Sequence, residues 1–118
     1  MAAPLLAVPN LSEGRDPTRI VALEKAFSYG ASLLDRHSDP DHNRTVLTLA
    51  GEPGSLREPL LRGAEVAIGA LDVCPLVWLD AAARDAARDE ALAVAAGIGA
   101  LGVPVFLYGA LASSPQRA

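Results

Sequence analysis

The sequence has little cysteine, few aromatic residues and no long apolar run. Its single cysteine, Cys74, excludes an internal disulfide and fits a reducing compartment. One Trp, two Tyr and two Phe among 118 residues leave Ala, Leu and Val to fill the core, which favours helices packed on a sheet. No apolar stretch reaches the roughly 18 residues that cross a bilayer, so we expect no membrane partner.

Charge is also sparse, and the formal net charge is −4 with a pI near 5.0. No basic stripe with interleaved aromatic residues is present, which argues against a nucleic-acid partner. The start, Met1 to Pro4, lacks the positive region of a signal peptide. We therefore expect a soluble cytoplasmic protein, with a single domain over residues 1–112 and a frayed tail over 113–118.

Apolar periodicity and turn residues predict eight elements. Asp16 is expected to cap the first helix, Ser55 and Glu58 to form a capping box for the second, and Asp80 to cap the third. Residues 10–15 and 38–41 are polar and are predicted to be a loop and a turn. The expected strands are 5–9, 31–35, 45–49, 71–79 and 103–108, and the expected helices are 17–29, 55–68 and 80–101.

This order, β-α-β-β-α-β followed by α-β, is typical of an α+β protein with the ferredoxin-like split βαβ plan and one added unit. Its helices cover one face of a mixed or antiparallel sheet. The first strand is then central and lies beside the third, to which it is antiparallel. The other sheet face stays open or is covered by a partner.

Two histidines, His37 and His42, alternate with the carboxylates Asp35, Asp39 and Asp41. Such a group invites a metal interpretation, but it lacks any standard zinc spacing, and we predict no metal site. His37 could act as a general base or, more simply, as an ordinary loop histidine.

A second group of polar residues lies at predicted strand ends. Backbone amides in the loop after the first strand suit an anion, although Gly14 could serve only a tight connection. Arg44 could bind a carboxylate through two hydrogen bonds or form a surface ion pair with Asp41 or Glu13. Asp72 enters an apolar strand and needs partners, for which Arg44 and the loop amides are candidates. The candidate binding residues are Asn10, Ser12, Glu13, Gly14, Asn43, Arg44 and Asp72.

Five motifs, in this order, resemble the N-terminal subdomain of glutamate formimidoyltransferase, an enzyme found alone or fused to a cyclodeaminase. They are Val8-Pro9-Asn10-Leu11-Ser12-Glu13-Gly14-Arg15, Leu33-Leu34-Asp35, His42-Asn43-Arg44-Thr45-Val46, Gly69-Ala70-Leu71-Asp72-Val73-Cys74-Pro75 and Gly102-Val103-Pro104-Val105-Phe106-Leu107-Tyr108-Gly109. The resemblance implies transfer of a formimino group from N-formiminoglutamate to tetrahydrofolate, which is a substrate rather than a bound cofactor. It also implies that folate and formiminoglutamate-type molecules are the ligands of the candidate residues.

The resemblance also exposes a gap. The family carries a His-Lys/Glu-Gly-x-His-Pro-Arg loop, with the presumed acid/base histidine, just before Gly-Ala-Leu-Asp-Val-Cys-Pro. Here Ile68 runs directly into Gly69, and His37 is the remaining candidate base. Family members also continue into a second subdomain. We therefore expect a weak or inactive catalyst when the chain is alone. The alternatives are a non-catalytic module that forms a homodimer or pairs with a separate second subdomain, and a different small-ligand enzyme that uses His37 and Asp35.

Overall fold

The computed structural model describes residues 4–102, and all statements about the structure concern these residues. The elements are β1 (Leu5–Ala7), β2 (Asn10–Leu11), α1 (Pro17–Phe27), β3 (Ser32–Asp39), β4 (Arg44–Gly51), α2 (Arg57–Val66), β5 (Leu71–Val73), β6 (Leu76–Trp78), a 3-10 turn (Ala81–Ala83) and α3 (Arg84–Ala100). The strand predicted at 103–108, the tail at 113–118 and the end of the predicted domain lie outside the described residues.

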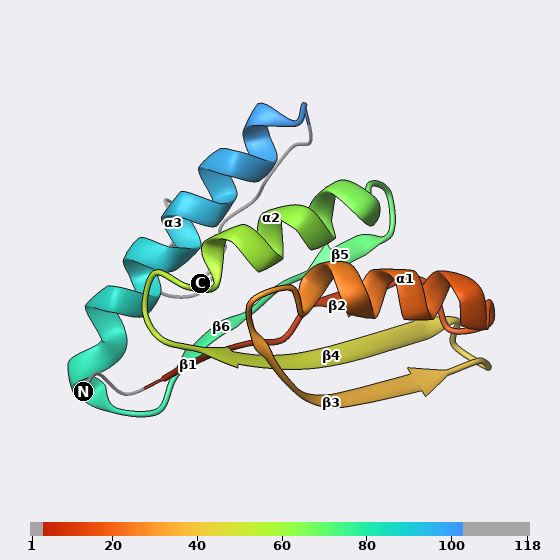
Figure 1. Cartoon of the computed structure of the whole chain (residues 1–118), viewed down its shortest axis with the longest axis horizontal. Helices are drawn as coiled ribbons and strands as arrows, with labels where there is room; N and C mark the ends of the chain where they lie inside the picture. The colour runs from red at the N-terminus through yellow and green to blue at the C-terminus, as the bar shows by residue number, and fades with distance from the viewer. Residues whose placement is uncertain (1–3, 103–118) are drawn as a thin grey trace, which may run out of the picture.

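The six short strands occupy four positions in one antiparallel sheet (Figure 1). β3 pairs with β4 along its whole length, while β1 and β2 together pair with the other side of β4. β6 and β5 then continue the sheet beyond β1 and β2. This order places β1 centrally and antiparallel to β4, which is the third of the predicted strands. It confirms the α+β ferredoxin-like prediction.

Two of the predicted strands have other bounds in the structure. The strand predicted at 5–9 ends at Ala7, and the single strand predicted at 71–79 is wrong because it is divided into β5 and β6. The breaks fall at Pro9 and Pro75, which have no N–H to donate to a sheet ladder. Neighbouring groups compensate, because Val8 N donates to Pro75 O at 2.9 Å and Leu47 N donates to Pro9 O at 3.1 Å. The two breaks therefore lie side by side, and they bend both strands at the same level of the sheet.

The loop predicted to start at Asn10 begins as a strand instead. Asn10 and Leu11 form β2 because Leu11 is fully buried between β4 and β5, so tertiary packing overrides the polar character of its neighbours. The loop proper starts at Ser12 and leads to α1. Similarly, β3 extends to Asp39, into the segment predicted as a turn.

The first helix starts as predicted, because the Asp16 carboxylate accepts hydrogen bonds from Thr18 N and Arg19 N. Asp80 accepts a hydrogen bond from Ala82 N, but it caps the 3-10 turn rather than α3, whose N-cap is Ala83 and has no side-chain cap. The capping box predicted for α2 is wrong. Leu56 is its N-cap and makes no side-chain cap, because the Ser55 hydroxyl donates to Glu52 O inside the preceding turn.

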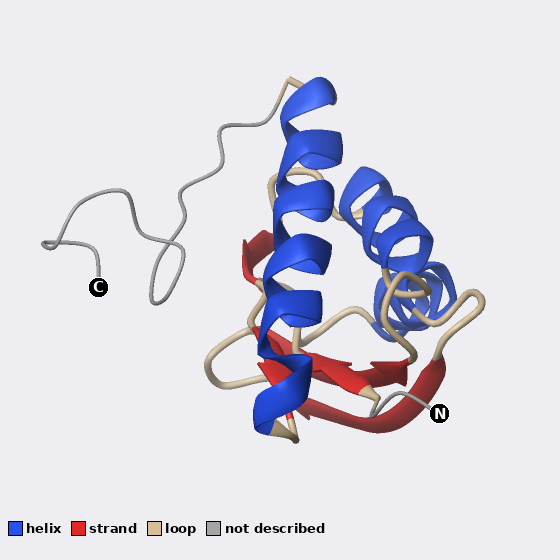
Figure 2. Cartoon of the chain, turned by 90° about the vertical axis from the view of Figure 1, so that its left-hand side faces the viewer, coloured by secondary structure: helices blue, strands red, loops and turns tan. Residues whose placement is uncertain are grey.

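All three helices lie on one side of the sheet, as predicted (Figure 2). α1 packs on β4 and on α2, and α3 packs against α2 and β6. The core between these layers consists of aliphatic side chains around one aromatic residue, Phe27. Its main buried members are Leu5, Leu11, Leu23, Phe27, Leu47, Leu49, Leu56 and Leu60.

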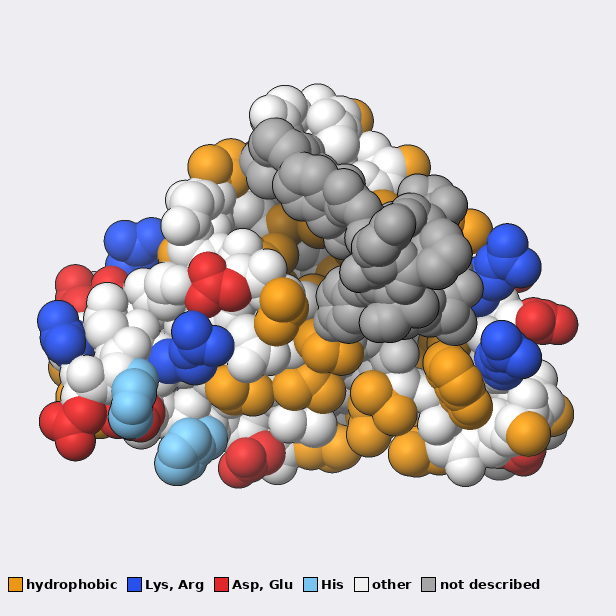
Figure 3. Space-filling view, turned by 180° about the vertical axis from the view of Figure 1, so that it is seen from behind, with side chains coloured by type: hydrophobic (Ala, Val, Ile, Leu, Met, Phe, Trp, Pro, Cys, Tyr) orange, Lys and Arg blue, Asp and Glu red, His pale blue; other side chains and the backbone are white. Residues whose placement is uncertain are grey.

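The opposite face of the sheet has no helix among the described residues, and Figure 3 shows this side of the molecule. Hydrophobic side chains gather there next to a charged end that carries histidine. Val73 and Val77, from the last two strands, are 43% and 37% exposed. Within residues 4–102, no helix has the length and apolar character that a membrane crossing requires.

Candidate functional site

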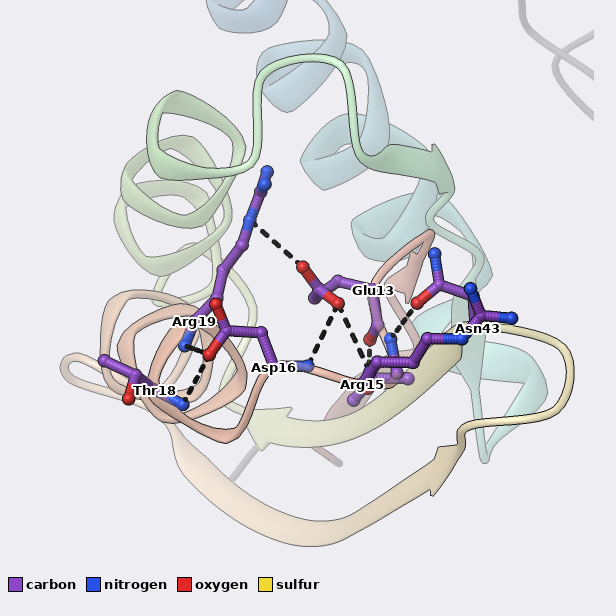
Figure 4. A network of polar contacts seen from close by, with 8 residues as sticks. Glu13, Arg15, Asp16, Thr18, Arg19 and Asn43 are labelled. Atoms are coloured by element: carbon purple, nitrogen blue, oxygen red, sulfur yellow. Dashed lines mark hydrogen bonds and ion pairs between the residues drawn. The ribbon is translucent and has the colours of Figure 1, made fainter.

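Two loops meet where β2 ends and β4 begins, as the antiparallel order predicts. Gly14 N donates to Asn43 Oδ1 at 2.9 Å, and the Thr45 hydroxyl donates to Glu13 O (Figure 4). A side chain at position 14 has no room, since a Cβ there would lie 2.4 Å from Arg44 N. Asn43 itself adopts a left-handed φ of 52°, which asparagine tolerates better than most residues. Gly14 and Asn43 therefore fix the position of Arg44.

The Glu13 carboxylate is held inside its own loop. It accepts hydrogen bonds from Arg15 N at 3.2 Å and Asp16 N at 3.3 Å, and Arg19 Nε lies 3.8 Å away (Figure 4). Its side chain is only 14% exposed. Glu13 thus orders the start of α1, and the loop amides that could have received an external anion are already engaged.

Asn10 and Ser12 project from the broken central strand. The Asn10 amide donates to Val8 O at 2.8 Å and so bridges the proline break. The Ser12 hydroxyl donates to Asp72 Oδ2 at 2.5 Å. Asp72 can reach Ser12 because β5 contains a bulge: Asn10 lies opposite Val73 and Leu11 opposite Leu71, which leaves Asp72 unmatched between them.

Arg44, at the start of β4, is a second partner of the Asp72 carboxylate. Its Nη2 lies 3.8 Å from Asp72 Oδ2, so Arg44 is the one of the two partners considered for Asp72 that the structure places beside it. The contact is long for a charge-assisted hydrogen bond, and the Arg44 side chain is 50% exposed. The guanidinium therefore keeps donors that can reach a ligand.

On its other side, Arg44 borders an open hollow of about 410 Å³ lined by His37, Asp39, His42, Arg44 and Val46. Asp39 Oδ2 lies 2.5 Å from His42 Nδ1. The hydrogen bond from His42 is the main reason that the pKa of Asp39 lies below its ordinary value. Sequence reasoning noted these residues but missed their convergence, because it depends on the register of β3 on β4.

The hollow has no arrangement that suggests a metal centre. Within the described ranges, no three His, Cys, Asp or Glu side chains gather in a geometry that could hold a metal ion. Asp35, two residues before His37, is not among the side chains that line the hollow.

Cys74 lies at the break between β5 and β6 and packs against the core, as predicted. Burial raises the pKa of its thiol to about 12. A neutral, partly buried thiol is a poor nucleophile, so Cys74 has a packing role.

Comparison with known proteins agrees with these motifs. A family described as the formiminotransferase domain, N-terminal subdomain, matches residues 4–68 and 62–118. The rat formimidoyltransferase-cyclodeaminase is 36% identical over 132 aligned positions, which include 93% of this chain and 24% of that protein. The glutamate formimidoyltransferase of Streptococcus pyogenes serotype M1 is 34% identical over 140 positions, with 99% of this chain and 45% of that protein. That of Thermoplasma acidophilum is 30% identical, with 93% and 42% covered.

The lengths of these matches bear on the gap noted in the sequence. The alignments are longer than the 118-residue chain, so the relatives carry positions that have no counterpart here. The family match also comes in two stretches that meet at residues 62–68, immediately before Gly69. The chain spans about a quarter of the length of the fused relatives and less than half that of the single-function ones.

Proposed function

The chain belongs to the family of formiminotransferase N-terminal subdomains, and on this basis we propose that it forms the carboxylate-holding part of a glutamate formimidoyltransferase. In this proposal, the complete enzyme moves a formimino group from N-formiminoglutamate to tetrahydrofolate. Both molecules carry carboxylates, which need cationic partners in the site. The names of the relatives support the reaction class, and the geometry around Arg44 supports the binding role.

The single observation that carries the binding role is the position of Arg44. Gly14 and Asn43 hold the backbone beside it, while its guanidinium stays half exposed and only loosely paired with Asp72. A rigid backbone with an available planar cation is what recognition of a carboxylate requires.

The same structure supports a weak catalytic role for the chain alone. α2 ends at Val66, and Gly69, with a φ of 84°, turns the chain directly into β5. Ala70 N and Leu71 N both donate to Ala67 O, so the connection is tight. In the proposal, this short turn replaces the loop with the acid/base histidine, and the reaction lacks its usual proton acceptor.

The test is an NMR titration of the ¹⁵N-labelled chain with glutamate and with folinate. We expect shift changes that cluster around Arg44, Asn43 and Ser12, with a dissociation constant no tighter than about 0.1–1 mM. Arg44→Ala should abolish binding. Arg88→Ala is the matched control, because Arg88 is exposed on α3, away from the sheet end. Shifts that cluster elsewhere, or equal binding by Arg44→Ala, would refute the proposal.

A second candidate function is a non-catalytic module that binds a partner through the helix-free face of the sheet. The observation that favours it is the exposure of Val73 and Val77 on the sheet face that carries no helix within residues 4–102. Large exposed apolar patches commonly mark protein interfaces. The two functions differ in what they require, since the module needs no ligand at Arg44.

A further inference from the structure

We infer that the hollow beside Arg44 is a binding site for a small carboxylate whose affinity rises when His37 and His42 become protonated. The inference rests on the proposed function in one respect, because Arg44 is shared. It goes further in naming a subsite between β3 and β4 and in making its strength depend on two imidazoles.

Strand register brings the imidazoles to Arg44. His37 lies opposite Val46, and Asp39 lies opposite Arg44. The intervening residues Thr45 and Leu47 are buried toward the helices. Because side chains alternate along a strand, the lining residues project from the helix-free face. His42 follows in the turn and is fixed there by its hydrogen bond to Asp39.

The other charges around the hollow nearly cancel, so the charge on the two imidazoles determines how strongly the hollow attracts a carboxylate. Among the five lining residues of this hollow, Arg44 is the permanent cation, and Asp39 is a permanent anion at neutral pH. Asp72, 3.8 Å from Arg44, offsets the guanidinium further. With neutral imidazoles the hollow therefore has no net positive charge, and it attracts a carboxylate weakly. Each added proton shifts this balance toward binding.

Other charges near the hollow do not change the sign of this effect. Asp35 shares the outer side of β3, where it lies opposite Thr48, and Asp41 is exposed in the turn. Arg15 reaches the same turn, where its Nε donates to Pro40 O at 2.9 Å. Imidazole is the side chain whose ordinary pKa falls between pH 5.5 and 8, so a change of affinity in that range would come from the histidines.

His42 is also well placed to contact a ligand. Asp39 engages Nδ1, which leaves Nε2 as the second donor of a protonated ring. Its side chain is 79% exposed, so a ligand can approach without displacing the protein. The low pKa of Asp39 keeps that carboxylate ionised throughout the range, and the ring stays oriented.

The experiment uses the whole chain and sodium glutamate as the probe, because both glutamate carboxylates stay ionised between pH 5.5 and 8. NMR titrations at the two pH values should show binding about three- to tenfold tighter at pH 5.5. His37→Gln and His42→Gln should each reduce this ratio, and the double variant should bring it close to one. The chain has two histidines, so the double variant has no titrating imidazole left.

A control variant separates a local effect from overall charge. Adding Arg88→His to the double variant places an imidazole on α3, where it should not restore the pH dependence. Binding that is independent of pH but lost in Arg44→Ala would overturn this inference and leave the proposed function intact. A pH dependence that persists in the double variant would also overturn it. No glutamate binding at either pH would overturn both.

Discussion

At the scale of the residue, Cys74 shows how burial controls reactivity. Its thiol has a pKa near 12 because it is desolvated, so the folded state favours the neutral form. This preference stabilises the fold below the ordinary pKa of 9.0, and the contribution is lost as the pH rises toward 12. We expect native Cys74 to react with a thiol reagent at pH 8 at least about 100-fold more slowly than in denaturant. Equal rates, followed by absorbance, would contradict this assignment.

Gly63 is a second residue whose environment predicts a measurable effect. A Cβ at this position on α2 would lie 2.2 Å from Phe27 Cδ1, inside the contact between α1 and α2. We expect Gly63→Ala to lower the free energy of unfolding by about 1–3 kcal/mol because the core becomes overpacked. Gly99 on α3 is the matched control, since a Cβ there meets no atom within 4 Å. Gly99→Ala should raise stability by up to about 1 kcal/mol. Urea unfolding followed by circular dichroism measures both changes.

At the scale of the element, a buried carboxylate joins α3 to the start of α2. Glu90 is fully buried. Its carboxylate accepts one hydrogen bond from Arg57 Nε at 2.5 Å and a second from Gly54 N. We expect Glu90→Ala to cost about 1–3 kcal/mol, because Arg57 and Gly54 N lose their charged acceptor and α3 loses an anchor. Glu58→Ala removes an exposed i,i+4 pair with Arg62 and should cost less than about 0.5 kcal/mol. Similar losses for the two variants, in thermal or urea unfolding, would show that Glu90 does not anchor α3.

The elements themselves divide into those that the sequence could predict and those that it could not. α1 was predictable because its signals are local: Asp16 caps it, Pro17 begins it and the buried residues recur at helical spacing. β2 was not, because the burial of Leu11 depends on distant strands. The capping box failed because Ser55 has a competing acceptor, Glu52 O, in its own turn.

The same division applies to the site. Arg44 and Asp72 could be paired in advance because the strand order brings one sheet end together. The hollow with Asp39 and His42 depends on the register of β3 on β4, and that register contains an irregularity between Leu33 and Asp35. A shift of one residue would move every side chain to the other face, so this site required the structure.

At the scale of the whole molecule, the helix-free face of the sheet predicts association. Val77 lies opposite Leu6 on this face and is 37% exposed, in β6, which is an outer strand of the sheet within residues 4–102. We expect a homodimer, or a complex with a separate second subdomain, through this face. Light scattering should show the dimer at high concentration, and Val77→Glu should weaken it. Leu92→Glu on α3 is the control and should not. A strict monomer that binds no second subdomain would contradict the prediction.

The whole molecule is expected to be a slow catalyst when it is alone. The tight turn at Gly69 connects α2 directly to β5 and leaves no segment that matches the histidine loop implied by the resemblance. In the proposed function, the site therefore binds a carboxylate but lacks an established proton acceptor. Loss of a general acid/base costs about 10²–10⁴-fold in rate. We therefore expect the isolated chain to transfer formimino groups from formiminoglutamate to tetrahydrofolate at least about 100-fold more slowly than a complete relative such as the streptococcal enzyme. A steady-state assay of both proteins measures the ratio. Turnover near that of the relative would contradict the expectation, and its loss in His37→Ala or His42→Ala would then identify the imidazole that takes over proton transfer.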